Sequence, residues 1–308
     1  MQTKSKESEV RMQRISLTPD LSDQTTLIVD GRYIAYRSMF SNQGKLSYNG
    51  RDTGMIYTFF RTLQSLANKY EVNNTVIMFD VTKSNEGVRR QEYEGYKVRE
   101  LKLNPNPKEI AQRKQFELDY HDLMVVTDKL GFAIYTLPGY EADDSIALFC
   151  KQFGGKKIIA TKDEDMYQLI NEDTMVADPS SNKKKDLKWF MREYGIPPEK
   201  WVEYKAIAGC KSDTVPGIPG MGHKRTLEYL SGKSPKYEKT IEKNKALYML
   251  CHNLVVLPHP SLNGHKIKWK QTKLNEDDFI GFCQSYGFNS FLNEIHNFYI
   301  FMEGGKVW

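Results

Sequence analysis

The sequence of 308 residues predicts an α/β fold with a largely parallel central sheet, followed by a mainly helical region. Two observations carry this prediction. Short apolar runs of strand length alternate with longer segments of helical periodicity up to about residue 185. Beyond that residue the strand signals fade and helical segments dominate. We therefore expect one domain at 25–185 and a helical region at 186–308, after a disordered polar tail at 1–24.

Five apolar runs have the length and composition of buried strands, and the segments between them have helical periodicity. A chain that alternates in this way typically forms a parallel sheet covered by helices. The expected strands are TLIVD (26–30), TVIMFD (75–80), FAIYTL (132–137), KIIATKD (157–163) and TMVAD (174–178). The expected helices lie roughly at 52–70, 109–130 and 142–153 in the first domain, and at 187–194, 198–208, 222–231 and 236–252 beyond it.

A polar stretch at 81–115 interrupts this alternation. It is rich in Lys and Arg, it carries Tyr93 and Tyr96, and LNPNPKE breaks any helix near 104–107. An insertion of this size in a compact domain is usually functional or disordered. Because the stretch directly follows Asp80, we expect it to rise over the end of that strand.

The composition sets broad limits on the class of protein. A hydrophobic content of 40% and a charged content of 27% are ordinary for a globular chain, and the net charge of +5 permits a polyanionic partner without establishing one. The cysteines have no C-x-x-C spacing, which indicates free thiols in a reducing compartment. No apolar run approaches the ~20 residues of a membrane span, and the N-terminus lacks the apolar core of a secretory signal. We expect a cytoplasmic monomer without membrane contact.

Acidic residues gather where predicted strands end and where one predicted helix begins. Ligands of an open α/β sheet bind beyond the carboxyl ends of its strands. Taken singly, each acid has a plain alternative as a helix cap or a turn former. Taken together, they would repel one another strongly without a compensating cation. The set is Asp30, Asp80, Glu141, Asp143, Asp144, Asp163, Asp165 and Asp213.

The residue types in this set indicate which cation would compensate them. Oxygen ligands without His or Cys spacing favour Mg²⁺, or Mn²⁺, over Zn²⁺. Two such ions about 3.5–4 Å apart can activate a water and stabilise the leaving oxygen of a phosphodiester. The sequence therefore predicts a site for two Mg²⁺, with Mn²⁺ as the alternative.

Two basic segments predict contacts with a nucleic-acid backbone. PGIPGMGHKR (216–225) places glycines around a turn before a helix that opens with basic residues, and such helix starts bind phosphate. VRRQEYEGYKVRE (88–100) interleaves basic residues with tyrosines that can stack on unpaired bases. The alternatives are a plain Pro/Gly loop and a solvated surface helix. The candidate nucleic-acid-binding residues are Arg90, Tyr93, Tyr96, Arg99, Gly217, Gly220, Gly222, Lys224 and Arg225.

These motifs together resemble the 5′-nuclease family, over about residues 26–230. The family includes flap endonucleases, the 5′-nuclease domain of bacterial DNA polymerase I, and phage 5′–3′ exonucleases and ribonucleases H. The resemblance rests on motifs that occur here in the family's order. They are VDGRYIAYR, FDVTKSNEGVRRQEYEGYK, GYEADD, TKDEDMYQLI and KSDTVPGIPGMGHK.

The resemblance implies a PIN-like sheet, a helical arch at about 81–115 and a duplex-binding helix–three-turn–helix at about 198–231, commonly with a K⁺ ion. Asp163, Asp165 and Asp213 would hold the second metal, and the other acids would hold the first and link the two. Lys97 and Arg89 would stabilise the scissile phosphate. The implied substrates are DNA with 5′ flaps, nicks or RNA–DNA ends, and the implied role is primer removal beside partners such as a single-strand binding protein. A chain without a polymerase domain resembles the phage-encoded versions.

Cys210 departs from the family pattern. The family usually has G-D-x-x-D where this chain has Gly209-Cys210-Lys211-Ser212-Asp213, so a thiol replaces the first aspartate. Cys is a poor ligand for Mg²⁺ but suits a softer metal. Two alternatives to an active 5′ nuclease follow. One is a branched-DNA-binding relative with weakened catalysis, and the other is a PIN-type RNA nuclease, which would not need the glycine hairpin.

Overall fold

The structure is a computed structural model, and it describes residues 21–42, 46–81, 86–98, 106–181, 183–268 and 275–298. Parts of two predicted features lie outside these residues: most of the tail at 1–24 and the segments 82–85 and 99–105 of the predicted arch. Within the described ranges, no helix is long and apolar enough to cross a membrane.

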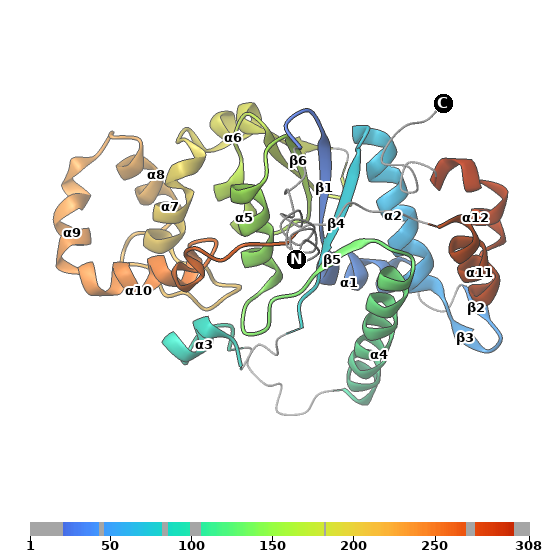
Figure 1. Cartoon of the computed structure of the whole chain (residues 1–308). Coiled ribbons are helices and arrows are strands. Elements are labelled where there is room, and N and C mark those ends of the chain that lie inside the picture. Colours follow the sequence, from blue (N-terminus) through green and yellow to red (C-terminus); the bar gives the residue numbers. More distant parts are fainter. Residues whose placement is uncertain are drawn as a thin grey trace, which may run out of the picture.

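A six-stranded sheet forms the centre of the molecule, with the order β5-β4-β1-β6-β7-β8 (Figure 1). All neighbouring strands are parallel except β7 and β8, which are antiparallel. This confirms the predicted α/β class and the largely parallel sheet. The strands are β1 (Thr25–Asp30), β4 (Asn74–Met78), β5 (Ala133–Tyr135), β6 (Lys156–Ala160), β7 (Thr174–Ala177) and β8 (Lys184–Lys185).

Helices cover both faces of the sheet, which explains why its strands are apolar on both sides. In β1, Leu27 and Val29 pack with one set of helices, whereas Ile28 packs with the other set. The first set is α1 (Gly31–Asn42), α2 (Gly54–Tyr70) and α4 (Pro107–Lys129). The second is led by α5 (Ala142–Gln152) and η1 (Glu164–Leu169), with α6 (Leu187–Tyr194) and α7 (Trp201–Ala208) beyond.

The predicted insertion is partly helical. A short α3 (Val88–Glu92) lies below the sheet in Figure 1, and α4 begins at Pro107 within the predicted range. The side chain of Asn106 caps α4 by accepting from the amide of Lys108 at 3.0 Å. Proline at the first helical position has the φ that a helix needs. LNPNPKE therefore marks where a helix begins, in agreement with the predicted break.

The helical region continues on the α5 side of the sheet. It contains η2 (Pro198–Lys200), α8 (His223–Leu230), η3 (Pro235–Tyr237), α9 (Glu238–Lys243), α10 (Lys245–Val255) and η4 (Pro260–Leu262). The single helix predicted at 236–252 is wrong in this detail, because the chain leaves helical geometry at Asn244, where ψ is 25°.

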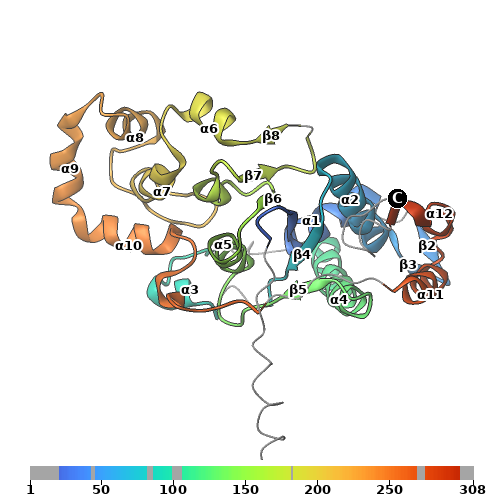
Figure 2. The same cartoon turned by 45° about the horizontal axis from the view of Figure 1, so that its top comes forward.

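The C-terminal helices lie on the opposite side of the molecule. Both views place α11 (Glu276–Tyr286) and α12 (Asn289–Asn293) beside α2 and the hairpin of β2 (Ser47–Tyr48) and β3 (Arg51–Asp52) (Figures 1 and 2). Phe279, Phe282 and Phe291 share a core cluster with Phe60 of α2. A last turn, η5 (Ile295–Phe298), adds Phe298 to this cluster. These residues thus pack with the α/β domain, which differs from their predicted grouping with the helical region.

Candidate active site

Three neighbouring strands deliver carboxylates to one edge of the sheet. Asp30 is the last residue of β1, Asp80 follows β4 by two residues, and Asp163 follows β6 by three. Because β4, β1 and β6 are adjacent and parallel, their carboxyl ends meet at the same edge. Asp30 is held there by the hydroxyl of Thr161, which donates to Oδ2 at 2.8 Å, and by the amide of Tyr33, which donates to Oδ1 at 2.9 Å.

The start of α5 brings further acids to this edge. Glu141 is the N-cap residue, and Glu141 and Asp144 form a reciprocal capping box. The backbone of the cap orients Asp143, whose carboxyl is influenced electrostatically by Asp163, Glu141 and Asp30. Asp80 is influenced in the same way by Glu141 and Asp30. The structure therefore brings Asp30, Asp80, Glu141, Asp143 and Asp163 into one cluster.

Burial and mutual repulsion keep protons on this cluster to unusually high pH. Burial, followed by the charge of Glu141, raises the pKa of Asp80 to about 7. Burial, followed by the charge of Asp165, raises the pKa of Asp163 to about 7. Burial also raises the pKa of Asp30, and it raises that of Asp143 well above its ordinary value. Such a group of carboxyls lacks sufficient positive charge.

Lys97, from the insertion, opposes this negative charge, and Arg32 of α1 does so to a smaller extent at Asp30 and Asp80. Its ammonium contacts Glu141 Oε1 and lies 3.9 Å from Asp213 Oδ1, and its charge lowers the pKa of Asp30, Asp80 and Asp163. The amide of Lys97 donates to the carbonyl of Asp213 at 2.8 Å, with the residue at a positive φ of 50°. The hydrogen bond holds the strained backbone of Lys97 in place, and the contact with Glu141 holds its ammonium at the cluster.

Asp144 and Arg89 form a buried ion pair. Arg89 is only 3% exposed, and it donates to the two Asp144 oxygens at 2.6 and 2.8 Å. The same Asp144 carboxylate accepts from the amides of His259 (2.7 Å) and Glu141 (3.2 Å). Arg89 also donates to the carbonyls of Leu254 and Val256. These contacts satisfy both groups and favour a structural role for the pair, and Arg89 also lies 3.5 Å from Glu141 Oε2. The metal role of Asp144 and the phosphate role of Arg89 remain predictions.

Tyr96 is buried, which favours a positioning role over the predicted stacking on bases. It is 5% exposed, it packs with Cys210, Val215 and Leu254, and its hydroxyl donates to Glu141 Oε2 at 2.8 Å. A ring enclosed in this way has no free face for a base, so Tyr96 positions Glu141 instead. Tyr93 and Arg90 remain partly accessible, and Arg90 donates to the carbonyl of Tyr96 at 3.0 Å. Arg99 lies outside the described residues.

The glycine hairpin has the close backbone approaches that its sequence suggests. Gly217 has a φ of +66°, and a Cβ there would lie 2.5 Å from the amide nitrogen of Gly209. Gly220 also has a positive φ, and its carbonyl accepts from Arg225 at 2.8 Å. Gly222 is the N-cap of α8, in front of exposed Lys224 and Arg225. The geometry leaves the start of this helix open to an anionic ligand.

A second group of possible metal ligands lies beside the first. One ligand atom each from Asp165, Cys210 and Asp213 lies within 4.8 Å of the others. Lys205 of α7 contacts this group, with its ammonium 2.8 Å from Asp165 Oδ1. Burial, partly countered by Lys97, raises the pKa of Asp213 to about 6. Asp165 and Asp213 thus form a mixed group with a thiol. Asp163, expected at the second metal, interacts electrostatically with this group and with Asp143 of the carboxylate cluster.

Sequence reasoning missed functional candidates on α1 and α7. Arg32 interacts with Asp80 electrostatically and lies 5.2 Å from the Phe116 and Tyr120 rings. Tyr36 and Phe40 on the same helix are 52% and 51% exposed. The motif VDGRYIAYR contained Arg32 and Tyr36, but nothing in it distinguished an exposed ring from a core ring. Lys205 carried no signal, since a lysine inside an apolar helix segment usually points to solvent.

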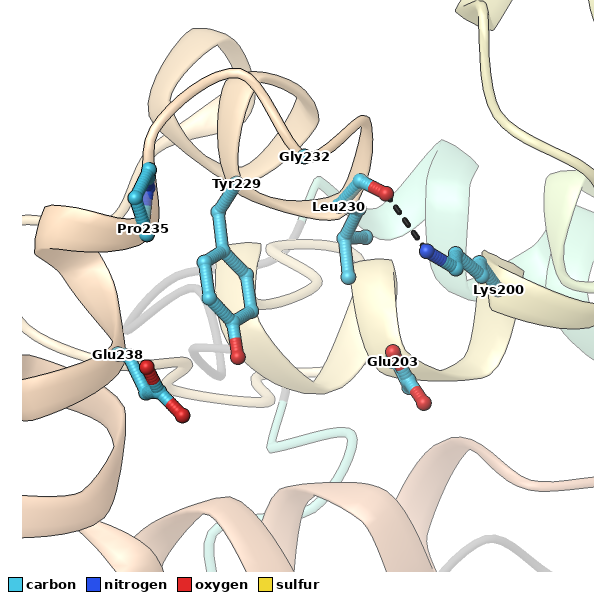
Figure 3. A pocket seen from close by; sticks show the side chains of 7 residues that line it. All are labelled: Lys200, Glu203, Tyr229, Leu230, Gly232, Pro235 and Glu238. Atoms are coloured by element: carbon cyan, nitrogen blue, oxygen red, sulfur yellow. Dashed lines mark hydrogen bonds between the residues drawn. The ribbon is translucent and has the colours of Figure 1, made fainter.

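A separate pocket of about 280 Å³ lies in the helical region (Figure 3). It is lined by Lys200, Glu203, Tyr229 and Glu238, among others, and Lys200 donates to the carbonyl of Leu230 at 2.7 Å. None of the carboxylates of the cluster lines it. We therefore place the candidate active site at the sheet edge and not in this pocket.

A comparison with known families identifies the α/β domain. The model of the 5′-3′ exonuclease N-terminal resolvase-like domain matches residues 25–195. The chain belongs to the 5′-3′ exonuclease family. The 5′-3′ exonuclease of Aquifex aeolicus is 32% identical over 213 residues, which is 67% of this chain and 69% of that protein. DNA polymerase I of Thermus thermophilus is 31% identical over 207 residues, or 66% of this chain, and the match spans only 23% of that polymerase.

Solved structures show the same fold. The T5 5′-exonuclease with bound divalent metal ions (zinc) matches with a TM-score of 0.66 at 23% identity, covering 78% of this chain and 92% of that one. The T5 D15 protein co-crystallised with metal ions matches with a TM-score of 0.65 at 22% identity, covering 78% of this chain and 91% of that one. At 22–23% identity, these matches establish that the chain has the same fold as the two T5 structures.

The two ligand groups differ in how well they suit a hard divalent cation. The cluster of Asp30, Asp80, Glu141, Asp143 and Asp163 offers oxygen atoms alone, which suits Mg²⁺. Asp80 Oδ1 is buried and has no hydrogen-bond partner among the described residues, as expected of an atom reserved for a cation. The group with Cys210 offers a thiol, which does not suit Mg²⁺.

The raised carboxyl pKa values predict that a rise in pH lowers the stability of the metal-free protein. Asp80 and Asp163 would ionise near 3.8 in the unfolded chain but near 7 in the folded protein. Between these values the folded state binds more protons, so the free energy of unfolding falls as pH rises and the loss is complete above the folded pKa. We expect a lower Tm at about pH 8 than at about pH 5 without metal, and a larger Mg²⁺-induced rise at the higher pH.

Thermal melts in a chelating buffer and in Mg²⁺ test this expectation. Asp163→Asn should flatten the dependence of the metal-free Tm on pH, because one titrating group is removed. A wild-type Tm that is constant or rises over this pH range, with no difference in the variant, would show that the cluster is not destabilised by its own charge.

Proposed function

We propose that the chain is a structure-specific, metal-dependent 5′ nuclease that hydrolyses phosphodiester bonds in DNA and RNA–DNA substrates. The observation that carries this proposal is the buried carboxylate cluster at the sheet edge, with Lys97 of the insertion held against it. The T5 D15 flap endonuclease, which shares this fold, has been crystallised as a pseudo-enzyme-product complex with DNA and metal ions, and this supports the same chemistry here.

The chain's own residues would divide the chemistry between them. Asp30, Asp80, Glu141, Asp143 and Asp163 would bind Mg²⁺ or Mn²⁺. When bound, these ions activate an attacking water and stabilise the leaving oxygen of an in-line displacement. The products would carry a 5′-phosphate and a 3′-hydroxyl.

Lys97 would stabilise the scissile phosphate as well as the carboxylates. Burial is the largest single influence and would lower its pKa, but the neighbouring charges, led by Glu141, together outweigh burial and raise the pKa well above the ordinary value. The ammonium therefore stays charged and can stabilise the negative charge that develops on the scissile phosphate. Tyr96 keeps Glu141 oriented beside it.

The DNA would be held on both sides of this centre. The hairpin at Gly217–Gly222, together with Lys224 and Arg225, would bind duplex phosphates without regard to sequence, with K⁺ as an additional ligand. On α1, the exposed rings of Tyr36 and Phe40 would stack on bases near the junction, since α1 begins directly after Asp30.

Replacing Tyr36 should weaken binding more than chemistry. We expect Tyr36→Ala to weaken the binding free energy for a 5′-flap duplex by about 1–3 kcal/mol, the range for one stacked base, with little change in the single-turnover rate at saturation. Tyr48→Ala is the matched control, because Tyr48 is an exposed tyrosine on the β2–β3 hairpin. Equal losses of affinity in both variants, or no loss in Tyr36→Ala, would show that the Tyr36 ring does not bind the DNA.

The substrate range is tested with matched labelled substrates: a 5′ flap, a nick, a 3′ flap and a duplex with an RNA 5′ segment. We expect cleavage near the 5′ junction, release of the RNA segment, and no cleavage of the 3′ flap. Release of RNA would support ribonuclease H activity and a role in primer removal during replication. Equal cleavage of the 3′ flap would contradict structure-specific recognition from the 5′ side.

A second candidate is a branched-DNA-binding relative with weakened catalysis. It is favoured by the thiol of Cys210, which stands among the acids where the family has an aspartate, and by the neighbouring ammonium of Lys205. In that case the flap would bind with ordinary affinity, and cleavage would appear only in Cys210→Asp.

A further inference from the structure

The mixed ligand group is built into a rigid turn. The amide of Cys210 donates to the Val215 carbonyl at 3.0 Å, and the amide of Val215 donates back at 2.9 Å. Gly209, with a φ of +80°, precedes this bridge, and a Cβ there would lie 2.8 Å from the Val215 carbonyl oxygen. The direction of the Cys210 side chain is thus set by the backbone.

The thiol of Cys210 points into a polar environment that lies next to the core. The residue is 7% exposed, and its Sγ lies 3.1 Å from Ser212 Oγ, 3.8 Å from Asp213 Oδ2 and 3.8 Å from Lys205 Nζ. An inert structural cysteine is normally surrounded by apolar atoms. Cys251 fits that description, since it is fully buried in an apolar cluster, whereas Cys210 faces two carboxylates and an ammonium.

The donor atoms distinguish this group from the carboxylate cluster. Carboxylate oxygens select hard cations, and thiolates select soft ones such as Zn²⁺, Co²⁺ and Cd²⁺. Two carboxylates and one thiolate leave a fourth position open to water, as in open tetrahedral sites. Lys205 holds a positive charge 2.8 Å from Asp165 Oδ1, which shows that this position already attracts a cation.

We propose that Asp165, Cys210 and Asp213 form a thiophilic metal site, which binds a soft divalent cation through Cys210 Sγ and does not hold Mg²⁺. The inference rests on the proposed nuclease function, because it concerns the second metal position of that site. The active centre then combines a hard position at the carboxylate cluster with a soft position beside it. The ammonium of Lys205 moves aside when the soft cation binds.

Titration of the full-length protein with Co²⁺ tests this site without any nucleic acid. We expect a thiolate-to-cobalt charge-transfer band in the wild type. In Cys210→Ser the band should be absent and Co²⁺ affinity at this position weaker by at least about tenfold. Cys150→Ser is the matched control and should keep the band, since Cys150 lies on α5 outside the ligand group. Cys210→Asp should lose the band and bind one more Mg²⁺ than the wild type by calorimetry.

Cadmium NMR on the wild type gives a readout that does not depend on how the variants fold. A ¹¹³Cd resonance shifted into the thiolate range supports the site. A resonance in the all-oxygen range, or a charge-transfer band that persists in Cys210→Ser, overturns it. Equal Mg²⁺ stoichiometry in wild type and Cys210→Asp overturns it as well. Flap cleavage measured on the same samples tests the nuclease function separately from the metal site. If no cation supports cleavage, the nuclease proposal fails, but the evidence for a thiolate ligand is unaffected.

Discussion

Asp143→Asn should abolish flap cleavage while leaving flap binding nearly unchanged. Asp143 interacts electrostatically with Asp163 and Glu141, and its pKa is raised well above the ordinary value by burial and then by the charge of Asp163. Its ionised carboxylate therefore needs a compensating cation. An amide keeps the size of the side chain but removes the charge that would hold the metal. We expect the single-turnover rate to fall by at least about 10²–10³-fold, the scale for one preorganised electrostatic contact.

Asp173→Asn is the matched control for this prediction. Asp173 is an exposed aspartate just before β7, so it lies at the opposite edge of the sheet from the cluster. The control should cleave like the wild type, and both variants should melt no earlier than the wild type. A single-turnover cleavage rate of Asp143→Asn within about tenfold of the wild-type rate would show that the reaction does not take place at the carboxylate cluster.

Arg89→Met should destabilise the protein more than the substitutions at the carboxylate cluster. The variant leaves the fully buried Asp144 carboxylate without its bidentate partner and frees the carbonyls of Leu254 and Val256. Breaking a buried ion pair from one side costs about 3–5 kcal/mol, because the remaining charge is uncompensated. Chemical denaturation should therefore show a midpoint shift that corresponds to a loss of that size in the free energy of unfolding.

Arg90→Met is the control, because Arg90 is the next residue and, within the described part of the chain, its side chain donates only to the Tyr96 carbonyl. We expect a loss of only about 1 kcal/mol from that variant. Asp144→Asn separates the structural role from the role of a metal ligand. It should lower stability and leave the number of bound metal ions unchanged. If Asp144→Asn is as stable as the wild type but binds one metal ion fewer, Asp144 is a metal ligand.

Much of the fold follows from local patterns in the sequence. The predicted strands at 26–30, 75–80 and 157–163 are apolar runs that end in aspartate, and the parallel order of β1, β4 and β6 places those ends together. The position of α1 was not predicted, since its apolar residues do not form a clear stripe and it follows β1 without a loop. The packing of α11 on α2 depends on contacts between aromatic residues far apart in the chain, which periodicity cannot reveal.

The site was predictable as a set of residue types but not as a set of contacts. Asp143 and Asp144 are neighbours in one motif, yet one faces the cluster and the other is enclosed by Arg89. The difference arises from the capping geometry of α5 and from a carbonyl pair on the distant segment 254–256. Tyr96 and Tyr93 are likewise three residues apart, and only Tyr96 is enclosed by the turn at 210–215.

One cleavage assay decides whether the carboxylate cluster cuts DNA. An end-labelled 5′-flap duplex is incubated with wild-type protein in Mg²⁺, in Mn²⁺ and in a chelator, with Asp143→Asn in parallel. We expect a cut near the junction in Mn²⁺, a slower cut in Mg²⁺, and none in the chelator or in the variant. Binding of the flap without a cut in either cation would contradict the nuclease proposal and would identify the chain as a DNA-binding relative.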